Sequence, residues 1–423
     1  MADLSIPNYL SMQNAYRDIY EQYVNDASFL WVLRSVTINQ PHYEASDILE
    51  LEQRIEAQID GLMTSVDIGW EVCDEALELE EAGEVFTSMV VAMRSHEISK
   101  IQKAVEAGLK NDSAIPGLIS AMGWLPDRIA NPWTERFLKG KDMNHKYLGL
   151  AACSVRRQNP GEILSDILQR DDCLQHEKLY ARALRLIGEL RRQDCMPWIN
   201  AALDDDNEII NFWANWSAAL LGQRSSVQNL KPLVFNDGPY QEQSIQLAFR
   251  VLPVEQAREW ISELSKDDGQ IRAVIKATGV LGDPHAINWL ISKMQDPILA
   301  KLAGESFAYI TGVDFEKHHL VVDEPDNYPI IPNDGDEDDN VGLDEDENLP
   351  YPDAEKVAAI WRNHGQNFVV GRRYFMGRPT TPEFLNEKLV YGAQRQRHAA
   401  ALELALNEND APLPNTRARI LAS

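Results

Sequence analysis

Apolar residues recur along this chain at spacings of three and four, which is the period of an α-helix that is buried on one face. In one early segment, Ile48, Leu51, Ile55, Ile59 and Leu62 form such a stripe. Similar stripes follow in later segments up to the end of the sequence. The pattern predicts an all-α protein built from amphipathic helices.

Turn residues mark the ends of these helices, most clearly in the segment 278–312. Gly282 and Gly312 each follow an apolar helix, and Asp283-Pro284 and Asp296-Pro297 each begin the next one. Glycine tolerates the left-handed conformation after a helix, aspartate caps a helix start, and proline at the first helical position leaves no amide hydrogen unpaired. Helix, turn, helix and turn together make one repeat of a solenoid.

The same pattern repeats upstream with a nearly constant period. Equivalent positions near the end of the second helix of each repeat are Gly123, Cys153, Gly188, Ala219, Arg250, Gly279 and Tyr309. Their spacings are 30, 35, 31, 31, 29 and 30 residues. A period of about thirty residues with two helices is typical of short HEAT-type repeats, since tetratricopeptide and ankyrin units have other lengths and signatures. We therefore predict a HEAT-like α-solenoid over residues 111–317.

Three further blocks flank this solenoid. Residues 1–110 read as an N-terminal helical block. Residues 318–355 contain no Lys or Arg and fourteen Asp or Glu, so we expect 318–352 to be an acidic, disordered loop that buries too little apolar surface to fold. Residues 356–423 hold ten Lys or Arg against five Asp or Glu. We expect a basic C-terminal block, 353–423, to be mostly helical and to pack back on the solenoid.

Composition narrows the possible partners. The formal net charge is -26 and the pI about 4.7, which argues against nucleic-acid binding because phosphates require an excess of Lys and Arg. A basic protein surface suits this charge better. The four cysteines have no C-x-x-C spacing, the start MADLSIPNYL does not resemble a signal peptide, and no apolar run is long enough to span a membrane. We expect a cytoplasmic protein with free thiols.

Sequence signatures of catalysis or metal binding are weak. Asp334, Asp336, Asp338 and Glu345 fit positions 1, 3, 5 and 12 of a calcium-binding EF-hand loop, but Asp339 stands where the loop needs glycine. A solvated acidic loop is the preferred interpretation, with a calcium site as the alternative. We find no phosphate-binding glycine loop and no nucleophile elbow. The sequence predicts no enzyme activity, no cofactor and no metal.

Aromatic and acidic residues in the middle of the solenoid are candidates for partner binding. Trp213 and Trp216 are expected to be exposed, because Phe212 and Ala219 can serve the core of the same helix. We expect the turn before that helix, with Asp204, Asp205 and Asp206, to offer three carboxylates to a basic partner.

The segment 371–379 mixes arginines with aromatic residues, as a single-stranded nucleic-acid site does. In so acidic a chain, pairing of Arg372, Arg373 and Arg378 with its own carboxylates is the interpretation we favour.

Several motifs resemble a bacterial family of uncharacterised HEAT-repeat proteins. They are Phe29-Leu-Trp31, Pro41-His-Tyr43, Ile59-Asp-Gly-Leu62, Gly83-Glu-Val-Phe86, Ala303-Gly-Glu-Ser-Phe307, Gly371-Arg-Arg-Tyr374, Gly377-Arg-Pro379 and Gln394-Arg-Gln-Arg397. Genes of this family typically lie near type VI secretion genes, among spike, PAAR-like tip and effector genes.

The resemblance implies a non-catalytic immunity protein that neutralises a cognate effector toxin. The alternative is an adaptor or chaperone that loads an effector onto the spike, with spike or PAAR-like components as further partners. A third class, a HEAT-type DNA glycosylase, would require a basic concave face, which the charge of the chain opposes.

Overall fold

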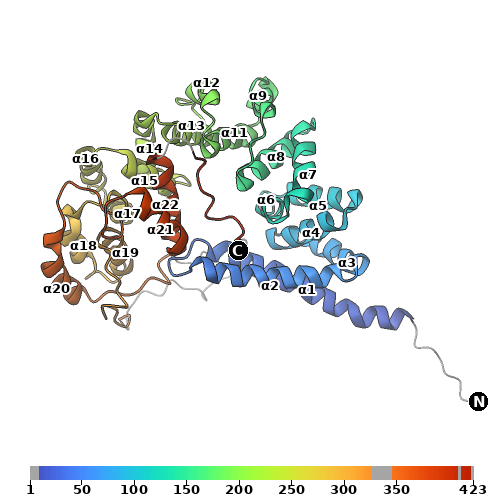
Figure 1. The fold of residues 1–423 in the computed structure, drawn as a ribbon, viewed down its shortest axis with the longest axis horizontal. Coiled ribbons are helices and arrows are strands. Elements are labelled where there is room, and N and C mark those ends of the chain that lie inside the picture. Colours follow the sequence, from blue (N-terminus) through green and yellow to red (C-terminus); the bar gives the residue numbers. More distant parts are fainter. Residues whose placement is uncertain (1–8, 326–344, 408–410, 421–423) are drawn as a thin grey trace, which may run out of the picture. The chain divides into compact units, whose positions relative to one another are not determined.

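The computed structural model describes residues 9–325, 345–407 and 411–420 (Figure 1). In these ranges it contains 22 α-helices, several short 3-10 turns and no strand, which confirms the predicted all-α class. The chain divides into two compact units, each described by itself below. Unit 1 comprises Met1–Asn39, Tyr43–Leu190 and Asn415–Ser423, and unit 2 comprises Gln40–His42 and Arg191–Pro414.

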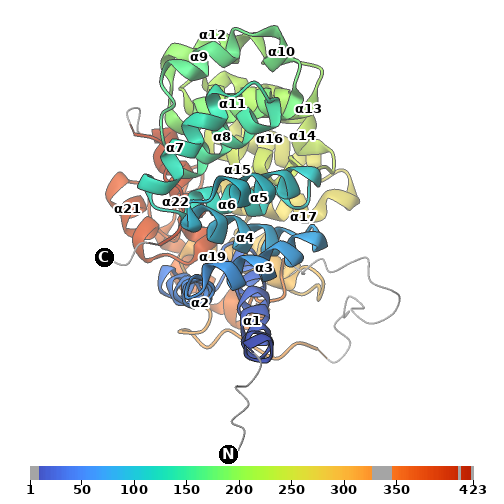
Figure 2. The ribbon, with the colours of Figure 1, turned by 90° about the vertical axis from the view of Figure 1, so that its right-hand side faces the viewer.

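Unit 1 is a stack of helices in two layers. Its helices are α1 (Tyr9–Thr37), α2 (Ala45–Met63), α3 (Val66–Ala76), α4 (Ala82–Ser95), α5 (Ile98–Lys110), α6 (Ile115–Trp124), α7 (Asp127–Lys139), α8 (Met143–Arg156), α9 (Glu162–Leu168), α10 (Asp171–Leu174) and α11 (Glu177–Leu190). Helices α4, α6, α8 and α11 pack one against the next, and α5, α7 and α9 with α10 form the second layer (Figure 2). Helices α1, α2 and α3 pack on α4.

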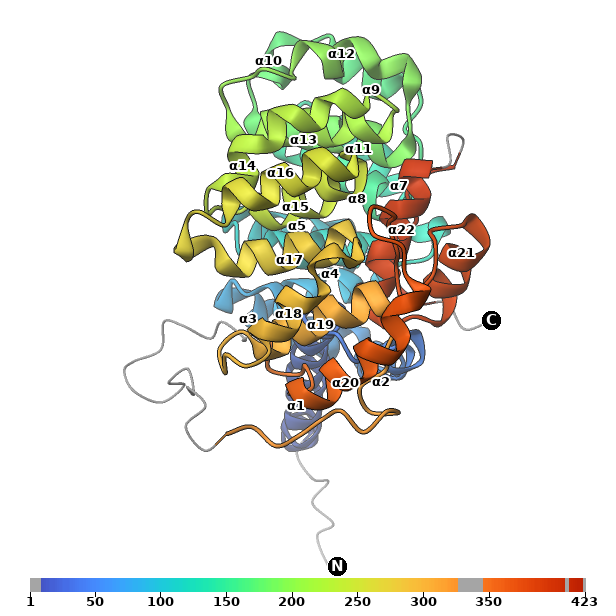
Figure 3. The same cartoon turned by 90° about the vertical axis from the view of Figure 1, so that its left-hand side faces the viewer.

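Unit 2 also has two layers of helices. Its helices are α12 (Met196–Ala201), α13 (Glu208–Leu220), α14 (Lys231–Phe235), α15 (Gln241–Val251), α16 (Val254–Leu264), α17 (Ile271–Leu281), α18 (Ile287–Lys293), α19 (Ala300–Thr311), α20 (Ala354–His364), α21 (Pro382–Tyr391) and α22 (Gln394–Asn407). Helices α13, α15, α17 and α19 pack in series, with α12, α14, α16 and α18 beside them (Figure 3). Helix α22 packs on α13 and α15, and α21 packs on α22.

The predicted repeat agrees with these layers. All seven equivalent positions, from Gly123 to Tyr309, fall in the last turn of a first-layer helix: α6, α8 and α11 in unit 1, and α13, α15, α17 and α19 in unit 2. The one long spacing, 35 residues between Cys153 and Gly188, includes the additional short helix α10. The chain is therefore an α-helical repeat solenoid.

The compact units do not follow the predicted blocks, because hydrophobic cores extend across the predicted boundaries. Residues of the 1–110 block share one buried cluster with the first repeats, from Tyr20 to Ala152. Likewise, Ala405 and Leu406 of the 353–423 block lie in one cluster with Phe212 and Leu247 of the solenoid. Within this C-terminal block α22 packs on α13 and α15, and residues from Asn415 onward belong to unit 1.

The acidic loop predicted for 318–352 is ordered at both described ends. Leu320 and Leu349 are buried, and Val321 forms an isolated antiparallel bridge with Pro352. The Asp346 carboxylate is also buried and lies 2.7 Å from the Arg272 guanidinium. The prediction of disorder was therefore too broad, because opposite charges on the solenoid fix part of this acidic segment. Residues 326–344 lie outside the described residues.

Glycine in the predicted turns takes the left-handed conformation, with φ of 73° at Gly282 and 99° at Gly222. Asp283 accepts a hydrogen bond from the amide of His285, as expected of a cap. The third predicted helix of this region starts later than expected. It begins at Ala300, since Asp296 holds a turn by accepting a hydrogen bond from the amide of Ile298.

These two glycines form a matched pair for mutation. A Cβ at Gly282 would lie 2.2 Å from the Tyr374 carbonyl oxygen, whereas at Gly222 nothing lies within 4 Å. Gly222→Ala should cost only the left-handed strain, about 1 kcal/mol, and Gly282→Ala should cost about 1–3 kcal/mol more because of the backbone clash. Thermal unfolding of both variants checks this. Equal losses of stability would show that the 369–378 segment does not pack on Gly282.

None of the helices in the described ranges is both long and apolar enough to cross a bilayer.

Candidate functional site

The predicted partner-binding tryptophans are less exposed than expected. Trp216 is buried, so the prediction of its exposure was wrong, and Trp213 is half-buried. The two indole rings meet edge to face with their centroids 5.3 Å apart, and the Trp213 ring also contacts the Phe212 ring. The physical reason is that α13 is covered by α12, α15 and also α22, which leaves it no free apolar face.

The turn before α13 has mixed exposure. Asp204 and Asp206 are exposed, and Asp205 is half-buried. The Asp205 carboxylate accepts a hydrogen bond from the Asn207 amide at 2.8 Å, and Asn207 in turn caps α13. Asp205 therefore contributes to the start of the helix. Its two neighbours are exposed, and the Asp204 carboxylate also accepts a hydrogen bond from the Asn229 side chain at 3.4 Å.

The calcium alternative lies largely outside the described residues, since Asp334, Asp336, Asp338 and Asp339 belong to the range 326–344. Glu345 is described and pairs with Lys276 at 2.6 Å. Among the described residues no group of three or more His, Cys, Asp or Glu is placed to hold a metal ion. The four cysteines are free and buried, as the sequence suggested.

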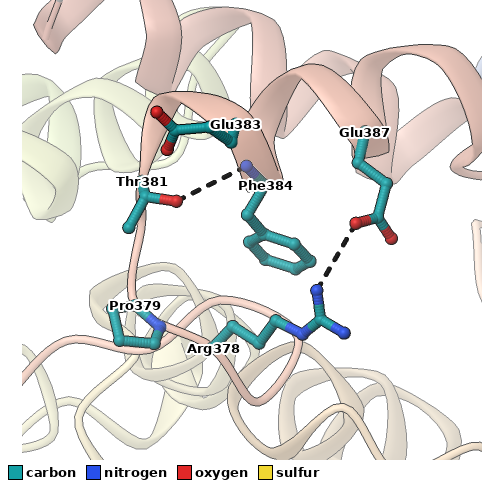
Figure 4. Close-up of a pocket in the computed structure, with 6 residues that line it drawn as sticks. All are labelled: Arg378, Pro379, Thr381, Glu383, Phe384 and Glu387. Atoms are coloured by element: carbon teal, nitrogen blue, oxygen red, sulfur yellow. Dashed lines mark hydrogen bonds and ion pairs between the residues drawn. The ribbon is translucent and has the colours of Figure 1, made fainter.

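Arg373 and Arg378 pair with carboxylates of the same chain, as predicted, whereas the Arg372 guanidinium lies 5.9 Å from the centroid of the Tyr374 ring. The Arg373 guanidinium lies 2.6 Å from Glu403, and Arg378 lies 3.4 Å from Glu387. Arg378, Glu387 and Phe384 line a shallow pocket of about 310 Å³ in which the guanidinium lies 5.0 Å from the ring centroid (Figure 4). Arg378 and Glu387 pair with each other, and Glu383 gives the lining one negative charge in excess.

A stronger candidate lies in unit 1, where the chain binds a segment of its own. Residues Asn415–Ile420, which form one turn and no helix, contact the ends of α6 and α8 and the side chains of α1 and α2. We call this stretch the 415–420 segment. The residues that hold it, Arg34, Glu52, Glu56, Arg94 and Trp124, are called the Glu56 site.

Arg419 is the side chain that this site recognises. Its guanidinium lies 2.9 Å from the Glu56 carboxylate and 4.3 Å from the centroid of the Trp124 ring. It also donates to the Trp124 carbonyl at 3.3 Å, one of the carbonyls that the end of α6 leaves without a helical partner. Ion pair, cation–π contact and helix-end contact all act on one cation.

The backbone of the segment is recognised as well. Arg34 donates to the carbonyls of Arg417 and Ala418 at 3.2 and 3.3 Å. The Glu52 carboxylate accepts the amide of Ile420 at 2.8 Å and is bound on its other oxygen by Arg34. These contacts bind backbone groups of the segment and do not depend on its side chains.

The Glu56 site is rigid because its parts belong to the core of unit 1. Glu52 and Glu56 lie one turn apart on α2, whose apolar stripe is buried. The Trp124 ring packs edge-on against the Phe86 ring, with 5.3 Å between the ring centroids. Its indole nitrogen donates a hydrogen bond of 2.9 Å to the Glu56 carboxylate. The opposite Glu56 oxygen pairs with Arg94. Arg419 therefore meets a carboxylate whose orientation is already fixed.

Burial and neighbouring charges shift the pKa values of Glu52 and Glu56 in opposite directions. Burial would raise the pKa of the Glu56 carboxyl, but Arg94, Arg419 and the Trp124 hydrogen bond favour its charged form and hold its pKa below the ordinary value. For Glu52, burial is the largest effect and raises the pKa against the opposing charge of Arg34. The charged form is therefore favoured more strongly at Glu56 than at Glu52.

Sequence reasoning missed this site. The one local signal on α2 is Glu52, a charged residue within an apolar stripe. Such a residue in a core-facing position indicates a buried ion pair. Nothing local indicates that residues 415–420 return to α2.

Arg419→Ala should release the 415–420 segment, because it removes contacts that contribute about 1–2 kcal/mol. Hydrogen exchange measures this as a loss of amide protection in 415–420 of roughly tenfold. Arg417→Ala is the matched control, since it removes the same charge from an exposed side chain. Similar protection in both variants would contradict the assigned role of Arg419.

Acidification should weaken the same contact. The pKa of Glu56 in the folded chain lies below its ordinary value of 4.5. Glu56 therefore stabilises the bound state at pH values above 4.5, and this contribution is lost as the pH falls. Protection of the 415–420 amides, corrected for intrinsic exchange, should therefore fall below about pH 4.5. In Glu56→Gln the protection should be low throughout. Any pH dependence that remains in this variant would come from Glu52 on the same helix, and a wild-type profile in this variant would contradict the assignment.

Comparison of the chain with protein-family models, with characterised proteins and with solved structures gave no match. The proposed function therefore rests on the geometry of the Glu56 site and on the resemblance of the sequence motifs.

Proposed function

We propose that this chain is a cytoplasmic, non-catalytic protein-binding solenoid of HEAT-like repeats, and that it acts as an immunity protein for a type VI secretion effector. Its cognate partner is a toxin with a basic surface. The repeat architecture supplies an extended scaffold of the kind that binds other polypeptides. The secretion context comes from the resemblance of the sequence motifs.

One observation carries the binding part of this proposal. In unit 1 the Glu56 site holds a polypeptide segment through its arginine and its backbone, with the Glu56 carboxylate 2.9 Å from Arg419 and the Trp124 ring beneath it. The same chemistry that retains Arg419 suits an arginine presented by a partner. Aromatic and arginine contacts of this kind are typical anchors of protein interfaces.

The charge of the chain supports a cationic partner. With a formal net charge of -26, its electrostatic field would speed the approach of a basic toxin. Asp204 and Asp206, which are exposed before α13, add carboxylates to that field in unit 2.

The test is affinity capture from the cells that encode the protein, followed by a growth assay with the captured effector. An immunity protein should bring down a basic effector, and its expression should restore growth of cells that produce this effector. The matched control is the Glu56→Lys variant, which reverses one charge of the site and should capture less.

Other outcomes separate the alternatives. Capture of an effector with spike or PAAR-like components, without rescue of growth, would replace immunity by the adaptor role. Deletion of the gene would then abolish secretion of the effector and leave the producing strain unharmed. If neither effector nor spike components are captured, the proposed function is wrong.

A further inference from the structure

We infer that the Glu56 site is a peptide-binding groove and that the 415–420 segment is its exchangeable internal occupant. The external ligand is a polypeptide segment without helical structure that carries an arginine in the place of Arg419. The inference rests on the proposed function for the identity of the partner, but not for the existence of the groove.

The groove recognises features that another polypeptide can supply. Two carbonyls are bound by Arg34 and one amide by Glu52, and every peptide has these groups. Sequence selectivity then depends on the single arginine between Glu56 and Trp124. Lysine would fit less well, because a guanidinium can stack on the indole and pair with the carboxylate at the same time.

The occupant is held mainly by polar contacts at the surface of unit 1. Arg417 and Ala418 are exposed, while Asn415, Thr416, Arg419 and Ile420 are half-buried. The 415–420 segment thus buries no residue fully, in contrast to Glu52 and Trp124, which are 1% and 4% exposed. A segment with so little apolar burial opens at a lower free energy than the core that carries it. The groove can therefore open while unit 1 remains folded.

The connection to unit 2 makes the internal occupant a competitor. The segment follows α22, which ends at Asn407, after only a few residues. The occupant belongs to the same chain as the groove, so an external segment competes with an intramolecular ligand and must bind more tightly or act together with a second contact. The bound segment thereby discriminates against isolated arginine-containing peptides and favours a partner that engages further surface.

The test uses a fluorescent peptide with the sequence of residues 411–420, Ala-Pro-Leu-Pro-Asn-Thr-Arg-Ala-Arg-Ile. The full-length Arg419→Ala chain, in which the occupant is weakened, should bind this peptide at least tenfold more tightly than the wild-type chain. The Arg417→Ala chain should behave like wild type. A peptide with alanine at the position of Arg419 should not bind, and adding Glu56→Gln to the Arg419→Ala chain should abolish binding of the original peptide.

A chain that ends at Pro414 provides the second variant, since it removes the occupant altogether. If neither this chain nor Arg419→Ala binds the peptide more tightly than wild type, the groove is not exchangeable and the inference is wrong. Binding of the peptide without capture of an effector in cells would leave the groove established and overturn only the proposed function. Binding that does not depend on Glu56 would overturn the assigned specificity.

Discussion

The carboxylate of Glu56 joins three parts of the chain that are far apart in sequence. One oxygen pairs with Arg94, and the other accepts the Trp124 indole and contacts Arg419. A half-buried carboxylate loses hydration and must recover that free energy from donors and cations. In unit 1 the donors on α4 and α6 are fixed by packing, and the cation is supplied by the 415–420 segment. The binding of that segment depends on this one group.

The same principle organises the basic block of unit 2. Glu403 on α22 meets Arg373 at 2.6 Å and Arg250 at 3.4 Å, and Arg395 lies 2.8 Å from Glu305. The acidic segment after the 326–344 range is held in turn by Arg272 through Asp346. An acidic protein thus neutralises its few cationic stretches internally. Its remaining surface carries the excess negative charge that a basic partner would meet.

Local chemistry allowed much of the fold to be predicted. Gly282, Gly312 and Asp283 mark helix ends because glycine conformation and capping act within a few residues, and the seven repeat positions follow from periodicity. The exposure of Trp216 was mispredicted because its burial depends on how α13 is covered, which periodicity does not reveal. The Glu56 site was missed for the same reason, since Glu52 and Ile420 are 368 positions apart. Such contacts are properties of the assembled core.

A double-mutant cycle between Glu56 and Arg419 tests the central claim most directly. Hydrogen-exchange protection of the 415–420 amides would be measured in the wild type, in Glu56→Gln, in Arg419→Ala and in the double variant. If the two groups act on each other, the double variant should lose little more than either single variant, with a coupling free energy of about 1 kcal/mol or more. Strictly additive losses would mean that Glu56 does not recognise Arg419, and they would contradict the account.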